Sequence, residues 1–201
     1  MKTKIFFLIL FAGLFIVGCG EPTTSNVDTI NDDAGAVTAL DYRDFDRAAS
    51  TMIQSLIGSG RLKKADGGRY VIVRGRIIND TTQYIDKSQL MTKIETDLTN
   101  SGLAVFTAMV GTNTDETLME SRELRESDEF NQNTTAAKGT AIAPDLSIAG
   151  KIFQRIVKVS RNKQRIEYHF FLQLSEVETG LTFWQDEVTF AKETTDKSLP
   201  M

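Results

Sequence analysis

The last third of the chain contains three apolar, β-branched segments whose connections are too short to hold a helix. The segments are Leu146–Val159, Arg165–Val177 and Leu181–Ala191. Strands joined by only a few residues pair antiparallel, whereas a parallel pair needs a crossover of about a dozen residues or more. The connection that ends at Gly180 suits a three-residue hairpin, because glycine adopts the positive φ that such a loop requires. The sequence therefore predicts an antiparallel, three-stranded unit, with its first turn near Ser160–Gln164.

The part of the chain that begins at Ala39 has a helical pattern. Asp41 or Asp44 is a candidate N-cap, and Gly58 or Gly60 is a candidate helix end. Apolar residues at helical spacing form one stripe between these limits. The members of that stripe are Phe45, Ala49, Met52 and Leu56, with Ala48 and Ile53 beside them.

Two strands and a second helix are predicted next. Arg69–Asn79 is β-branched and apolar on both faces, which is typical of a central strand. Asp86–Asn100 has an amphipathic pattern; Asp86 and Gln89 resemble a capping box, and Gly102 suits the C′ position. Leu103–Ala108 is a short apolar segment, which predicts a further strand.

Two less regular segments separate these elements from the three-stranded unit. Thr114–Glu129 is acidic and only weakly periodic, so it predicts a marginal helix, and Asn131–Pro144 is polar and predicts a loop. The predicted order is α-β-α-β-(α)-β-β-β. The early β-α-β unit favours one parallel pair, and the late hairpins are antiparallel. We therefore expect an α/β (α+β) fold, a single mixed β-sheet flanked by α-helices.

The N-terminus has the pattern of a targeting sequence. Lys2 and Lys4 precede an uncharged apolar run, Ile5–Val17. A membrane-spanning helix needs about 20 apolar residues, so this shorter run fits the hydrophobic region of a signal peptide. The only cysteine of the chain, Cys19, comes directly after it.

The residues Ile16-Val17-Gly18-Cys19 resemble the lipobox of bacterial lipoproteins. The resemblance implies that residues 1–18 are a signal peptide and that Cys19 becomes the acylated, palmitate-bearing first residue. Several acyl chains anchor a protein stably, where one chain binds only marginally. Gly20, in place of an aspartate after the cysteine, implies an outer-membrane location facing the periplasm. The alternative is an ordinary secreted protein in which Cys19 occupies this position by chance.

The remaining organisation follows from composition. Residues 19–38 are small, polar and acidic, which is typical of a flexible tether. Such a tether reaches at most ~70 Å when fully extended and spans roughly 25 Å as a coil. We expect a folded domain at residues 39–192 and a polar tail at residues 193–201.

The composition gives little basis for catalysis or metal binding. One cysteine excludes an intramolecular disulfide and a cysteine-based zinc site, and one histidine excludes two-histidine metal motifs. His169 lies within a predicted strand, where a half-exposed structural role is more common than catalysis. The acidic residues of Thr114–Glu129 are interspersed with Arg122 and Arg125, which indicates a solvated face rather than a hydrolase site. We expect no enzyme and no cofactor, and the net charge of −4 gives no reason to expect nucleic acid as a partner.

A local basic cluster contrasts with the acidic chain. The stretch from Arg155 to Arg165, which includes the first predicted turn of the three-stranded unit, has five cations and no acidic residue: Arg155, Lys158, Arg161, Lys163 and Arg165. On a hairpin they gather near its tip, which makes them a candidate partner-binding patch. The alternative is that these residues only solubilise a turn and blunt a sheet edge.

The segment Tyr168–Trp184 resembles the LpoB, CsgG and TolB-type periplasmic domains, in which a strand, a Thr-Gly turn and a strand carrying tryptophan follow one another. The first helix, with Asp41-Tyr42 and Phe45, resembles the opening of the LpoB-type domain. The strand and helix that follow it, and the segment Pro144–Gly150 that ends at a glycine, match the next elements of that domain. The resemblance covers roughly residues 40–192.

This resemblance implies a function. Proteins of the LpoB family are outer-membrane lipoproteins that bind and activate a bifunctional, class A penicillin-binding protein and thereby regulate peptidoglycan synthesis. They are not enzymes. Well-known members have a long, proline-rich tether, whereas this chain has a short one and three prolines in all. The alternative is a structural CsgG/TolB-type lipoprotein domain in an envelope secretion or motor assembly.

Overall fold

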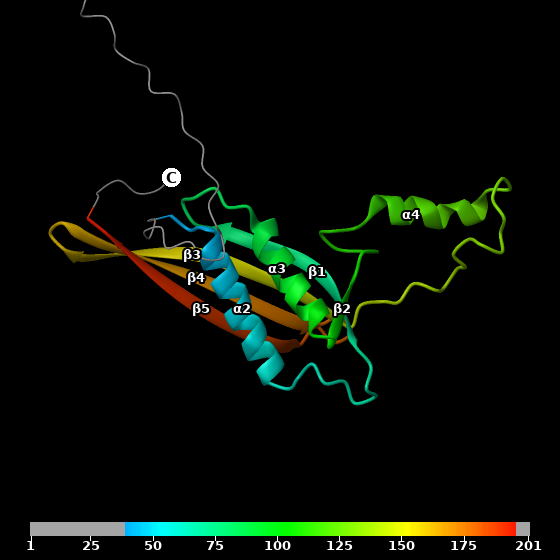
Figure 1. Ribbon diagram of the computed structural model, residues 1–201, viewed down its shortest axis with the longest axis horizontal. Helices are drawn as coiled ribbons and strands as arrows, with labels where there is room; N and C mark the ends of the chain where they lie inside the picture. The colour runs from blue at the N-terminus through cyan, green and yellow to red at the C-terminus, as the bar shows by residue number, and fades with distance from the viewer. Residues whose placement is uncertain (1–38, 196–201) are drawn as a thin grey trace, which may run out of the picture. The chain divides into compact units, whose positions relative to one another are not determined.

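The computed structural model describes residues 39–195, which contain one mixed five-stranded sheet flanked by helices (Figure 1). The predicted signal peptide (1–18), Cys19 and the tether (19–38) lie outside the described residues, as do residues 196–201 of the predicted tail. The strand order is β2-β1-β3-β4-β5. The strands are β1 (Tyr70–Asp80), β2 (Ala104–Thr107), β3 (Leu146–Ser160), β4 (Lys163–Glu176) and β5 (Thr182–Thr194).

The pairing directions confirm the predicted fold class. The central strand β1 is parallel to both of its neighbours, β2 and β3. The pairs β3–β4 and β4–β5 are antiparallel, as the short connections require. The parallel and antiparallel halves meet at β3, which gives the single mixed sheet expected from the sequence.

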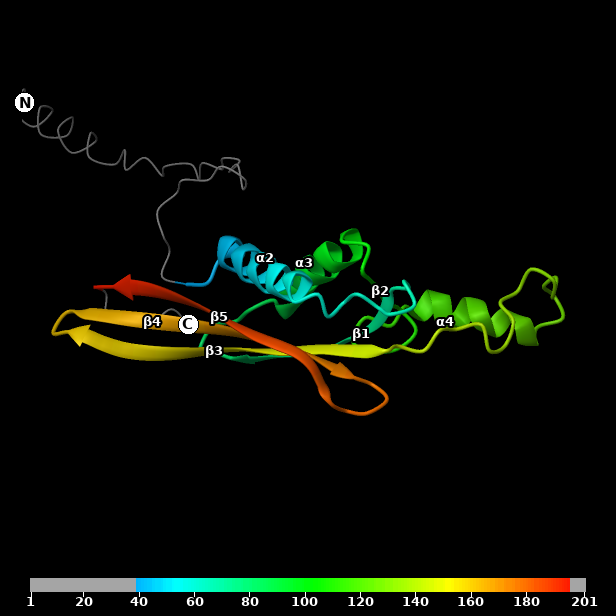
Figure 2. The ribbon, with the colours of Figure 1, turned by 90° about the horizontal axis from the view of Figure 1, so that it is seen from below.

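Two helices cover one face of the sheet (Figure 2). Helix α2 (Tyr42–Gly58) begins with a capping box: the Asp41 carboxylate accepts from two backbone amides, and Asp44 accepts from the Asp41 amide at 3.0 Å. Asp41 is thus the N-cap, and the other candidate, Asp44, is its reciprocal partner. Helix α3 (Lys87–Asn100) begins at the predicted N-cap Asp86, whose carboxylate accepts from the Ser88 amide.

The core lies between these helices and the sheet. Along β4 every second residue from Ile166 to Leu174 is buried, because successive side chains of a strand point to opposite faces. The Phe170 ring packs edge-on against Phe45 of α2, with centroids 5.9 Å apart. The predicted helical stripe is wholly buried: Phe45, Ala48, Ala49, Met52, Ile53 and Leu56.

A close approach of two backbones explains one glycine of β3. A Cβ atom at Gly150 of β3 would lie 2.6 Å from the Phe171 carbonyl oxygen of β4. This separation is shorter than a non-bonded carbon–oxygen contact allows, so the pairing of the two longest strands requires glycine there.

Three boundaries differ from the sequence prediction. The β3–β4 turn contains only Arg161 and Asn162, so β4 begins two residues earlier than expected. Strand β5 continues to Thr194, past the expected end at Ala191. The acidic segment forms α4 (Glu116–Glu123) and a 3-10 turn, η1 (Leu124–Glu126). Within residues 39–195 no helix is long and apolar enough to cross a membrane.

Candidate functional site

The β3–β4 hairpin extends beyond the helices that cover the sheet (Figure 2). From Arg155 to Ser160 nearly every residue of β3 is exposed, whereas buried and more exposed residues alternate in the first half of the strand. The last buried position of β4 toward the turn is Ile166. The hairpin tip therefore presents both of its faces to solvent, and we define it as residues 155–165.

The tip brings together the five cations predicted from the sequence. Arg155 lies opposite Glu167, Val157 opposite Arg165, and Ser160 opposite Lys163. A register shift between Lys158 and Ser160 precedes the turn. The strand pairing thus gathers on one hairpin end residues that are up to ten positions apart in the sequence.

Glu193 of β5 divides these cations into two groups. Its carboxylate accepts from the Arg165 guanidinium at 2.8 and 3.2 Å and forms an ion pair with Lys163. The hydrogen bonds from Lys163 and Arg165 hold the pKa of the Glu193 carboxyl below its usual value. Lys163 and Arg165 are thus engaged in attaching the hairpin to β5.

The other three cations are available to a partner. Arg155, Lys158 and Arg161 have no ion pair within residues 39–195. A hollow of about 480 Å³ lies beside the turn and is lined in part by Lys158 and Arg161. Exposed apolar side chains accompany the charges, since Ile156 and Val159 are 40% and 44% exposed. The tip combines unpaired positive charge with apolar surface, which are the components of a protein-docking site.

His169 is part of a cross-strand contact rather than a catalytic arrangement. Its Nδ1 lies 2.7 Å from Glu187 Oε1 and 3.1 Å from Thr189 Oγ1. In a hydroxyl–histidine–carboxylate triad the hydroxyl and the carboxylate contact opposite ring nitrogens, whereas here both contact the same one. Within residues 39–195 no group of three histidine, cysteine or acidic side chains is placed to hold a metal ion.

An aromatic surface that no sequence motif indicates surrounds this histidine. The His169 ring stacks on Phe153, with centroids 4.5 Å apart and an interplanar angle of 3°. The Lys151 ammonium lies 5.5 Å from the centroid of the Phe153 ring. The same ammonium forms an ion pair with the Asp80 carboxylate at 2.6 Å. These residues lie on the sheet face opposite the helices. The alternation of apolar and polar residues along β4 could have indicated this surface, because it places His169 and Phe171 on the opposite face from the core residues.

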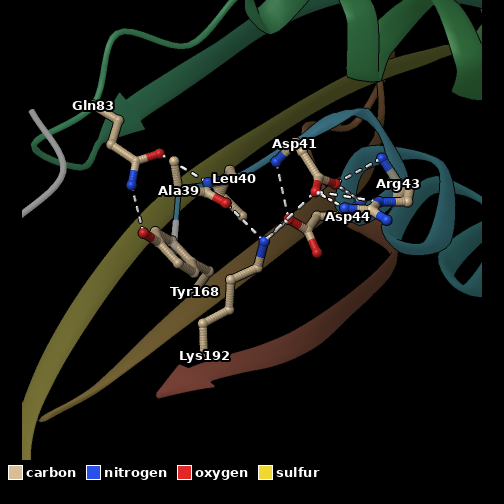
Figure 3. Close-up of polar contacts among 8 residues, drawn as sticks. All are labelled: Ala39, Leu40, Asp41, Arg43, Asp44, Gln83, Tyr168 and Lys192. Carbon is tan, nitrogen blue, oxygen red and sulfur yellow. Dashed lines mark hydrogen bonds and ion pairs between the residues drawn. The ribbon is translucent and has the colours of Figure 1, made fainter. Parts of the chain in front are cut away.

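A polar cluster fixes the point at which the described chain begins (Figure 3). Lys192 of β5 donates to the Ala39 carbonyl at 2.7 Å and pairs with Asp44 at 2.5 Å. The side chains of Lys192 and Asp44 are only 13% and 8% exposed.

A second set of contacts in Figure 3 continues this cluster into the core. The Leu40 amide donates to Gln83, and Gln83 Nε2 donates to the Tyr168 hydroxyl at 2.5 Å. Burial raises the pKa of that hydroxyl. The segment before α2 is therefore tied to β5 and, through Gln83, to β4.

Comparison with known proteins identifies similarities at the level of sequence and fold. A family model described as peptidoglycan-synthase activator LpoB matches residues 44–190. The LpoB C-terminal domain from Escherichia coli is 11% identical and has a TM-score of 0.42, covering 74% of this chain and 99% of that one. The corresponding domain from Salmonella enterica is 13% identical, with a TM-score of 0.40 and coverage of 73% and 98%. Comparison with curated proteins gives no match.

The buried ion pair at the start of α2 predicts a large effect of one substitution. Lys192→Met removes the cation that faces the nearly buried Asp44 carboxylate and leaves that charge uncompensated. We expect the free energy of unfolding to fall by roughly 3–5 kcal/mol, as is usual when one partner of a buried pair is lost. Urea denaturation followed by circular dichroism measures this change.

Lys93→Met is the matched control. Lys93 also pairs with aspartates, Asp46 at 3.1 Å and Asp97 at 3.5 Å, but it is more exposed than Lys192. Its loss should cost below about 1 kcal/mol. Equal losses in the two variants would contradict the role assigned to Lys192.

Proposed function

Because this chain belongs to the family of LpoB peptidoglycan-synthase activators, we propose that it is an outer-membrane lipoprotein that binds a class A penicillin-binding protein and activates it. The observation that carries this proposal is the extent of the family match. Residues 44–190 include nearly all of the sheet and of α2, and the whole of α3 and of the hairpin tip. The protein acts by binding, and the synthase supplies the catalytic groups.

The hairpin tip is the surface that we assign to the synthase. It carries three cations that have no ion-pair partner among residues 39–195. It also projects from the covered part of the sheet, so a synthase reaches it without displacing a helix. Charged groups at a protein interface set the association rate and the orientation of the partner. The synthase is therefore expected to present an acidic surface with an apolar centre that accepts Ile156 and Val159.

The lipid anchor and the tether decide where this surface acts. Acylation of Cys19 places the domain at the outer membrane, and the 20 residues from 19 to 38 set its distance from the lipid. An extended chain of this length covers at most about 70 Å. Contact is therefore expected where the synthase projects toward the outer membrane.

A glycan-polymerisation assay with the purified class A synthases of the host tests the function. The chain from Gly20 onward should raise the polymerisation rate of one of them. The double variant Lys158→Glu, Arg161→Glu should lower the affinity for that synthase at least roughly tenfold, because like charges then face each other.

The control is Lys63→Glu, Arg69→Glu, which changes the same residue types by the same charge. Both control residues are exposed, and Arg69 directly precedes β1, away from the hairpin tip. Absence of stimulation with every class A synthase would contradict the function. Equal effects of the two double variants would contradict only the assigned surface.

Cell fractionation tests the location. Cys19→Ala removes the thiol that receives the lipid, so the protein should disappear from the outer-membrane fraction, whereas Ser25→Ala in the same segment should leave it there. Retention of the Cys19→Ala protein in the outer membrane would refute lipid anchoring at this residue.

A further inference from the structure

Helix α4 projects from the sheet, and no other helix or strand of the described chain covers it. It belongs to the arm, which we define as residues 108–145, between β2 and β3. None of the residues of α4 is buried. Leu118 and Met119 are 37% and 38% exposed, and the arm extends beyond the sheet in both views (Figures 1 and 2). An exposed helix with adjacent apolar side chains is a candidate for recognition by another surface.

The arm nevertheless has a defined internal structure. Arg122 of α4 donates to Thr140 Oγ1 at 3.0 Å, which joins the outgoing and returning halves of the arm. Lys138 pairs with Glu126 at 2.8 Å, and Gln132 donates to the Ser127 carbonyl at 2.7 Å. These contacts hold α4 in a fixed orientation relative to the returning segment, so docking would not require the helix to form first.

The acidic side chains of α4 have no ion-pair partner in the described part of the chain. Glu116, Glu120 and Glu123 follow i, i+4, i+7 spacing and therefore lie on one face of the helix. None of the three has an ion pair within residues 39–195. Met119 is three positions from Glu116 and four from Glu123, so apolar and acidic groups are adjacent on this surface.

The complementary surface lies at the other end of the same sheet. The hollow at the hairpin tip is lined by the unpaired cations Lys158 and Arg161 and by Ile156. It therefore offers positive charge beside exposed apolar surface, which is the counterpart of the α4 face. Complementary potentials of this kind favour one mutual orientation.

The two surfaces cannot meet within one molecule. Strand β3 leads from the arm to the hairpin turn, and its 15 residues span about 50 Å. We propose that α4 of one copy docks into the hairpin hollow of a second copy. Because each molecule then keeps one free arm and one free hollow, the contact is head-to-tail and extends into chains or rings.

Sedimentation velocity of the chain from Gly20 onward tests this contact. The weight-average mass should increase with protein concentration at low salt and return toward the monomer at high salt, since the pairing groups are exposed. Reversing the arm (Glu116→Lys, Glu120→Lys, Glu123→Lys) or the hollow (Lys158→Glu, Arg161→Glu) should each raise the dissociation constant at least roughly tenfold.

A charge exchange makes the test specific. The two reversed proteins should each remain monomeric alone, because arm and hollow then carry the same charge. They should associate when mixed, because each arm then meets a hollow of opposite charge on the other protein. The control Lys63→Glu, Arg69→Glu should associate like the unmodified chain. A monomer at every concentration and salt, or no association in the mixture, would overturn the proposal.

Reversal of the arm charges also distinguishes self-association from synthase activation. The arm-reversed protein keeps the hairpin tip intact, so it should lose self-association and still stimulate the synthase. If the arm-reversed protein associates as well as the unmodified chain, α4 is not the docking element and the proposal fails, whatever the stimulation assay gives.

Discussion

A strand rises about twice as far per residue as a helix, and this difference determines which surfaces of the domain are exposed. Strand β3 spans about 50 Å with 15 residues, whereas α2 spans about 25 Å with 17. Helices of this length cover only part of one face, so the β3–β4 hairpin continues past them into solvent. The position of the basic tip is thus a consequence of packing, since the covered region ends near Ile166 and the cations begin directly beyond it.

Two consecutive residues of β5 connect the covered part of the domain to the exposed part. Lys192 and Glu193 point to opposite sides of the strand, as successive side chains must. Lys192 holds the start of α2 through Ala39 and Asp44, while Glu193 holds the hairpin through Lys163 and Arg165. The edge strand β5 therefore fixes both the entry of the chain and the orientation of the tip. This also explains why β5 continues beyond Ala191, where the sequence pattern predicts a polar tail.

Much of the fold could be predicted because local signals agree with tertiary packing. The spacing of Met52 and Leu56 identifies the buried face of α2 correctly, and the short connections after Leu146–Val159 and Arg165–Val177 identify the antiparallel pairs. The cations of the hairpin could also be located, because they are close in sequence. The sequence could not show that Glu193 pairs with only two of these cations. Glu193 is 28 positions from Arg165, and its place opposite Arg165 depends on the β4–β5 pairing. The projection of the arm from the sheet could not be predicted either, because the weak periodicity of Thr114–Glu129 does not indicate where the ends of this segment attach.

Hydrogen–deuterium exchange of the chain with and without its class A synthase tests the assigned surface most directly. Backbone amides in residues 155–165 lie beyond the helical cover, so their exchange reports contact at the tip. The account predicts that synthase binding slows exchange there and leaves α3 unchanged. Slowed exchange confined to the helices, with the hairpin tip unaffected, would contradict it.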